Sequence, residues 1–204
     1  MQFLASLGYT VLQVDFHFWQ GVSGYFTNSP YNKSTLTSDF AEIQKVLNWA
    51  VKQGVSKTDN ACILSFGYSS FAAYQNVMNN PGQFKCMLNY AGMADLIYFK
   101  ENAFFYLGYE LLKFQLGSDD KLLKEKSPIN HLEKLNLPVL LLHGENDRYV
   151  RVNQSRRMYK ELQDADKDVS YIELHKGHHA LISYENRAKT LKSIEAFLQK
   201  YLRK

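Results

Sequence analysis

The sequence alternates short, strand-like apolar runs with segments whose apolar residues have helical spacing. The predicted strands are 9–15, 61–66, 85–90, 139–143 and 169–174. A helix is predicted from the cap candidates Ser38 and Asp39 to a stop at Gly54, and a second over 191–201. This alternation predicts an α/β fold, with a mostly parallel sheet flanked by helices and ligands at the carboxyl ends of the strands.

Composition places the chain among globular proteins. With 204 residues, 46% hydrophobic and 22% charged, we expect one domain spanning 1–204 with a sizeable core. The net charge of +4 is scattered, so we expect no nucleic-acid or membrane partner. The apolar start, 1–19, lacks a basic region and is broken by Gly8 and Asp15, which argues against a signal peptide.

The two cysteines suggest a compartment. Cys62 and Cys86 each lie in a predicted buried strand, so we expect two reduced core thiols rather than a disulfide or a metal pair. Reduced thiols favour a cytoplasmic location.

One segment, about 94–126, departs from the alternation. It is rich in aromatic residues and has helical spacing in places, so we interpret it as a helical insertion over the sheet. Its rings are expected to be core, with a substrate-facing lid or a partner surface as the alternative.

Three segments follow predicted strands and carry chemically useful side chains. They are Ser65-Phe66-Gly67-Tyr68-Ser69-Ser70, Leu142-His143-Gly144-Glu145-Asn146-Asp147 and Leu174-His175-Lys176-Gly177-His178-His179. Their order is a strand-to-helix elbow, an acid and a histidine. This order resembles the α/β-hydrolase fold, and more closely the catalytic domain of the prolyl oligopeptidase family, in its acylaminoacyl-peptidase-like branch.

The resemblance extends along nearly the whole chain. It includes Leu4-Ala5-Ser6-Leu7-Gly8-Tyr9, Asn48-Trp49-Ala50-Val51, Ser127-Pro128-Ile129 and Asn153-Gln154-Ser155. It implies an ancestral serine peptidase acting on peptides or acyl-peptides, with no cofactor. In that scheme Asp147 orients His178, which acts as the general base.

The elbow departs from the family pattern at its central position. The family motif Gly-x-Ser-x-Gly-Gly places Gly67 where the nucleophilic serine belongs, and glycine has no hydroxyl. We therefore expect catalysis to be lost or severely impaired, as in a pseudoenzyme. The competing hypotheses are a hydrolase that uses Ser69 or Ser65, or water activated by His178, and a non-catalytic binding or assembly module.

The resemblance also implies an incomplete oxyanion site. The backbone N–H of Tyr68 would supply one donor, and the family's second donor lies on a loop that we expect this chain to lack, together with the first strands of the sheet. A truncated chain, a complementing N-terminal segment or an oligomer is the expected consequence. The histidines at 175, 178 and 179 lack a further ligand at a recognised spacing, so no metal is expected.

Overall fold

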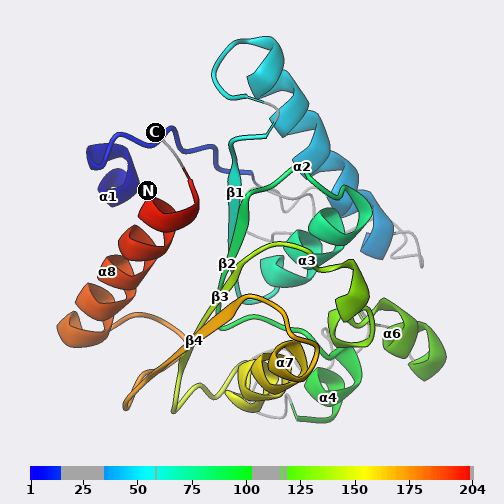
Figure 1. The fold of residues 1–204 in the computed structure, drawn as a ribbon. Coiled ribbons are helices and arrows are strands. Elements are labelled where there is room, and N and C mark those ends of the chain that lie inside the picture. Colours follow the sequence, from blue (N-terminus) through cyan, green and yellow to red (C-terminus); the bar gives the residue numbers. More distant parts are fainter. Residues whose placement is uncertain (15–34, 58, 103–115, 117–118, 203–204) are drawn as a thin grey trace, which may run out of the picture. The chain divides into compact units, whose positions relative to one another are not determined.

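The computed structural model describes residues 1–14, 35–57, 59–102, 116 and 119–202 (Figure 1). These residues form two compact units, Met1–Thr58 and Asp59–Arg203. The first unit contains α1 (Gln2–Ser6) and α2 (Thr35–Lys52). Helix α2 ends at Lys52, and the predicted stop Gly54 follows with a φ of 70°, the left-handed conformation that glycine adopts at helix ends. The helix begins at Thr35, so the predicted caps Ser38 and Asp39 lie inside it and not at its start.

The second unit is a four-stranded parallel sheet in the order β1 (Cys62–Phe66), β2 (Cys86–Tyr90), β3 (Val139–Gly144) and β4 (Val169–Leu174). The central strands β2 and β3 are buried along their whole length, which explains their continuous apolar runs. The predicted α/β class and four of the five predicted strands are confirmed.

Helices cover both faces of this sheet (Figure 1). Helix α8 (Tyr184–Tyr201) packs on β2 and β3, whereas α3 (Ser69–Asn79) and α7 (Asn153–Asp164) pack from the other side. Two short helices, α4 (Leu96–Asn102) and α6 (Asp120–Lys126), pack together within the segment predicted as an insertion. Two 3₁₀ turns, Pro128–Asn130 and Leu132–Lys134, lead into β3.

The predicted strand over residues 9–15 is wrong over its described part. Residues 9–14 have no strand structure, and Asp15 lies outside the described residues. A run with strand propensity becomes a strand only by pairing, and these residues pair with none of the four described strands.

The prediction of two free thiols is also wrong, because Cys62 and Cys86 form a disulfide. They are direct partners in the β1–β2 register, with Cα atoms 4.7 Å apart, which lies within the range that a disulfide spans. The sequence places each cysteine at the start of a strand but does not reveal that the strands are neighbours. Because the two cysteines are not free thiols, they no longer support the predicted reducing compartment.

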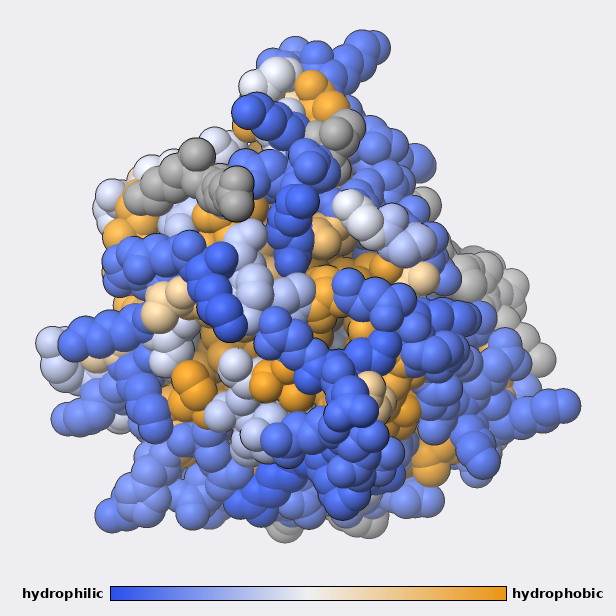
Figure 2. All heavy atoms as spheres, in the orientation of Figure 1, coloured by the Kyte–Doolittle hydropathy of each residue, from blue (hydrophilic) through white to orange (hydrophobic). Residues whose placement is uncertain are grey.

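The surface seen in Figure 2 is mostly hydrophilic, with hydrophobic areas between the polar side chains. In the described ranges, no helix is both long and apolar enough to cross a membrane.

Candidate active site

The carboxyl ends of the four strands lie in register, so the loops that follow them emerge at one edge of the sheet. Phe66 pairs with Tyr90, Tyr90 with Leu142, and Gly144 with Leu174. The elbow, the acid loop and the histidine loop are therefore brought to the same edge, as the sequence predicts.

The elbow between β1 and α3 turns at Gly67, whose φ is 55°. Its N–H donates to the carbonyl of Tyr90 at 2.9 Å, and its carbonyl accepts from the N–H of Ser70 at 3.2 Å. A residue with a side chain is strained in this left-handed region, and glycine is not. Tyr68 follows as the N-cap of α3.

The serines around the elbow bind backbone groups. Ser69 Oγ accepts from the N–H of Phe66 at 2.9 Å and donates to its carbonyl at 2.8 Å. Ser70 Oγ donates to the Gly67 carbonyl and accepts from the N–H of Met93. Ser65 is 4% exposed and donates to the carbonyl of Leu88. Each hydroxyl thus stabilises the backbone of the turn or of the sheet by a hydrogen bond.

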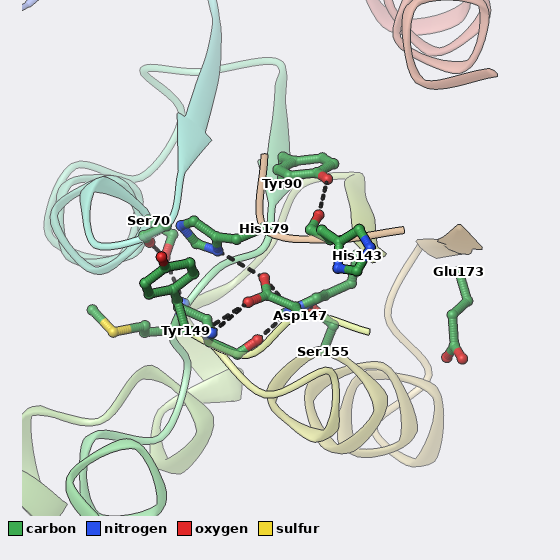
Figure 3. A network of polar contacts seen from close by, with 12 residues as sticks. Ser70, Tyr90, His143, Asp147, Tyr149, Ser155, Glu173 and His179 are labelled. Carbon is green, nitrogen blue, oxygen red and sulfur yellow. Dashed lines mark hydrogen bonds and ion pairs between the residues drawn. The ribbon is translucent and has the colours of Figure 1, made fainter. Parts of the chain in front are cut away.

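Asp147 is the acid of the cluster and is 2% exposed (Figure 3). Its Oδ1 accepts from the N–H groups of Tyr149 and Val150, at 2.8 and 2.9 Å. Its Oδ2 accepts from Nδ1–H of His179 at 2.7 Å and lies 3.3 Å from Nε2 of His143. Burial raises the pKa of this carboxyl, but the hydrogen bonds from the two histidines outweigh it and hold the pKa at about 2.

The histidine paired with Asp147 is His179, whereas the sequence analysis expected His178. The side chain of His178 is exposed and lines a pocket of about 320 Å³ with residues 145–148, which include Asp147, and with Arg151. Its carbonyl accepts from the hydroxyl of Tyr90 at 3.0 Å. Neighbouring side chains in a non-helical segment point in different directions, and here it is the ring of His179 that hydrogen-bonds to the acid.

The ring of His179 is directed at the elbow (Figure 3). A Cβ built on Gly67 would lie 3.3 Å from Nε2 and 3.4 Å from Cε1 of His179. The ring also contacts two aromatic side chains, Phe66 at 4.8 Å and Tyr149 at 5.4 Å between centroids. The imidazole of His179 thus contacts the carboxylate of Asp147 on one side and faces the turn at Gly67 on the other.

The acid and histidine loops approach each other through two glycines. A Cβ on Gly144 would lie 2.6 Å from the carbonyl carbon of Gly177, and a Cβ on Gly177 would lie 2.9 Å from Cα of Gly144. Two backbone bonds join the loops, from Glu145 N–H to the Leu174 carbonyl and from Asn146 N–H to the Gly177 carbonyl. Only glycines permit this backbone contact, which fixes Asp147 relative to His179.

His143 is the site residue that the sequence analysis did not single out. It is fully buried at the end of β3, and its Nε2–H donates to the carbonyl of Val150 at 2.8 Å. Its Nδ1 lies 2.7 Å from the hydroxyl of Ser155, within hydrogen-bond distance. These partners fix the orientation of the ring behind Asp147. Its position directly before Gly144, in the segment that leads to Asp147, could have identified it from the sequence.

Two cationic side chains after Asp147 are paired. Arg156 binds Glu173 through Nε and Nη2, at 2.8 and 2.5 Å, and Arg157 lies 2.8 Å from the carboxylate of Asp95. Over the described residues no group of histidine, cysteine and acidic side chains is arranged to hold a metal ion.

Two curated peptidases are similar to this chain in sequence. The chain is 27% identical to dipeptidyl aminopeptidase BIII of Pseudoxanthomonas mexicana and 24% identical to dipeptidyl peptidase family member 6 of Caenorhabditis elegans, each over 98% of this chain. It spans only 30% and 28% of the length of these relatives.

Solved structures share the fold. A puromycin-hydrolyzing peptidase of Mycobacterium tuberculosis matches with a TM-score of 0.75 and 23% identity, over 80% of this chain and 25% of that chain. The Pyrococcus horikoshii acylaminoacyl peptidase matches with a TM-score of 0.71 and 19% identity, over 83% of this chain and 28% of that chain. The model of the prolyl oligopeptidase family matches residues 1–204. The chain therefore belongs to the prolyl oligopeptidase family.

Proposed function

We propose that this chain is a serine-peptidase-like domain in which hydrolysis is lost or severely impaired, because Gly67 occupies the nucleophile position. One observation carries the proposal. Nε2 of His179, held by Asp147 through Nδ1, lies 3.3 Å from the Cβ that a side chain at position 67 would have.

Each group of such a site has a defined role in acyl transfer. A serine hydroxyl forms the bond to the carbonyl carbon, and the histidine takes the hydroxyl proton and later donates it to the leaving amine. Asp147 and His179 are placed to move that proton, but Gly67 offers no atom that can form the acyl bond. The backbone N–H of Tyr68 is proposed as one oxyanion donor, because it follows the nucleophile position.

Peptides or acyl-peptides are the proposed ligand class, since the family comprises peptidases. A second oxyanion donor would come from another segment, either of a longer chain or of a partner subunit. Loss of one such donor costs about 100-fold to 1000-fold in rate, so that segment would matter for any activity that is restored.

The alternative nucleophiles are less well supported. The hydroxyl of Ser69 both donates to and accepts from the backbone of Phe66, and Ser65 is buried against Leu88. A serine that attacks a carbonyl must instead hand its proton to the histidine.

Hydrolysis of N-acyl peptide esters tests the proposal. We expect the protein to show almost no hydrolysis above the solvent rate, and the variant Gly67→Ser to exceed it at least about 100-fold. The added Cβ requires a shift of His179 by a few tenths of an ångström, and the left-handed backbone costs about 1 kcal/mol, so the variant should fold.

The two neighbouring histidines supply a matched control. Combining Gly67→Ser with His179→Ala should abolish the gained hydrolysis, whereas combining it with His178→Ala should leave most of it. Hydrolysis by the unmodified protein that disappears in Ser69→Ala would contradict the proposal and favour the relocated nucleophile.

A further inference from the structure

One edge of the His179 ring faces Gly67, and the side chain is 21% exposed. Nδ1 donates to Asp147, but within the described part of the chain no hydrogen-bond partner is seen for Nε2. A Cβ on Gly67 would have only two atoms within 4 Å there, and both belong to the His179 ring. If position 67 were serine, its hydroxyl would lie in this region next to Nε2 of His179.

Asp147 determines what Nε2 can bind. Because Nδ1 keeps its proton to donate to Asp147, neutral His179 presents only a lone pair at Nε2. After taking up a proton, Nε2 becomes a charged donor, and a charge-assisted bond to an anionic oxygen is about twice as strong as a neutral one. The pKa of Asp147, about 2, keeps its carboxylate ionised at neutral pH beside this ring.

We propose that the region between His179 and Gly67 binds the free carboxylate of a peptide or acyl-peptide, with one oxygen accepting from Nε2–H. The inference rests on the proposed function, which supplies the peptide chemistry. A serine hydroxyl would occupy the place of this oxygen, whereas glycine leaves it to the ligand. The substitution thus converts a site of acyl transfer into a site that holds the acid product.

The surroundings of His179 indicate which peptide end fits. Phe66 and Tyr149 flank the ring and are 38% and 41% exposed, so they offer aromatic surface to an apolar last residue. The titratable groups facing His179 are Asp147 and Tyr149, with His143 behind Asp147. Tyr90 stacks on Phe66 and stays neutral, because burial and the charge of Asp147 raise its pKa to about 12.

Calorimetry with two peptides tests the inference. The probes are N-acetyl-Ala-Ala-Phe with a free carboxylate and the same peptide with a carboxamide end. We expect the acid to bind roughly 10-fold to 100-fold more tightly than the amide.

Three variants locate the site. His179→Ala should remove the preference for the acid, and His178→Ala should preserve it. Gly67→Ser should weaken acid binding at least about 10-fold with little effect on the amide, since its hydroxyl competes for the same place. Circular dichroism and the melting temperature of each variant show whether it is folded.

Several outcomes would overturn the inference. They are equal affinity for acid and amide, no binding of the acid at millimolar concentration, and an acid preference that survives in His179→Ala. These outcomes are separable from failure of the proposed function. If Gly67→Ser gains hydrolysis while the unmodified protein shows no preference for the peptide acid, the proposed carboxylate site is refuted and the proposed function is not.

Discussion

Gly67 and His179 face each other across 3.3 Å, measured from the Cβ that Gly67 lacks to Nε2 of the imidazole. The elbow keeps its left-handed turn, and the histidine keeps its hydrogen bond to a buried acid. The structure thus places a buried carboxylate and an imidazole next to a turn position that carries no side chain. Preservation of that geometry has consequences for stability as well as for chemistry.

Adding a methyl group at the contact between the acid and histidine loops should be costly. In Gly144→Ala the new Cβ would lie 2.6 Å from the backbone of Gly177, so one loop must move. We expect a loss of about 1–3 kcal/mol in the free energy of unfolding, measured by urea denaturation. Gly82→Ala is the control, because its Cβ has nothing within 4 Å and only its φ of 81° opposes the change, at about 1 kcal/mol. Equal losses in the two variants would show that the loop contact is not tight.

Asp147 should make unfolding depend on pH in the acid range. Its folded pKa of about 2 lies below the ordinary 3.8, so its contribution is fully present above about pH 4 and is lost as the pH falls through about 2. Asp147→Asn cannot titrate. The difference in unfolding free energy between the protein and this variant should therefore shrink by about 2 kcal/mol from about pH 6 to about pH 2. A difference that is constant with pH would mean that Asp147 is not held by the histidines.

The disulfide should be detectable and stabilising. Cys62 and Cys86 are 24 residues apart, and closing a loop of that length stabilises the folded state by about 3 kcal/mol in the chain-entropy model. The protein should resist alkylation until it is reduced, and reduction should lower its melting temperature. The double variant Cys62→Ala with Cys86→Ala should melt at the same temperature with and without reductant. Alkylation of both native thiols without reductant would contradict the bond.

The two adjacent serines of the elbow should differ in their importance. Ser70 is fully buried and joins the Gly67 carbonyl to the N–H of Met93. Ser70→Ala removes the acceptor of the Met93 N–H and leaves the Gly67 carbonyl with only the N–H of residue 70, so it should cost about 1–3 kcal/mol. Ser69 contacts only the backbone of Phe66 in a more exposed position, so Ser69→Ala should cost about 1 kcal/mol or less. Thermal unfolding of the two variants compares them directly, and a larger loss in Ser69→Ala would be contrary to this account.

The sequence predicts the layered architecture well because buried strands can be recognised from their continuous apolar runs. Continuous apolar runs mark β2 and β3, and Gly54 marks the end of α2. The run over residues 9–14 has the same local character, yet no strand forms there. Strand propensity reports how well a segment suits a sheet, and the presence of a partner strand is a non-local fact.

The site shows the same division between local and non-local information. Asp147 and Gly67 follow from motifs with fixed positions relative to a strand end, and the structure brings both toward one imidazole. The choice between His178 and His179 depends on the direction of a loop, which the motif does not encode. The disulfide depends on strand order and register, so two cysteines 24 residues apart could not be paired from the sequence.

Intact-mass spectrometry after treatment with a fluorophosphonate probe tests the central claim most directly. Such probes form a covalent bond with an activated serine, so the account predicts no adduct on the protein and one adduct on Gly67→Ser, mapped to position 67. The adduct should be lost with His179→Ala and retained with His178→Ala. An adduct on the unmodified protein, at Ser69 or Ser65, would contradict the claim that Gly67 has removed the nucleophile.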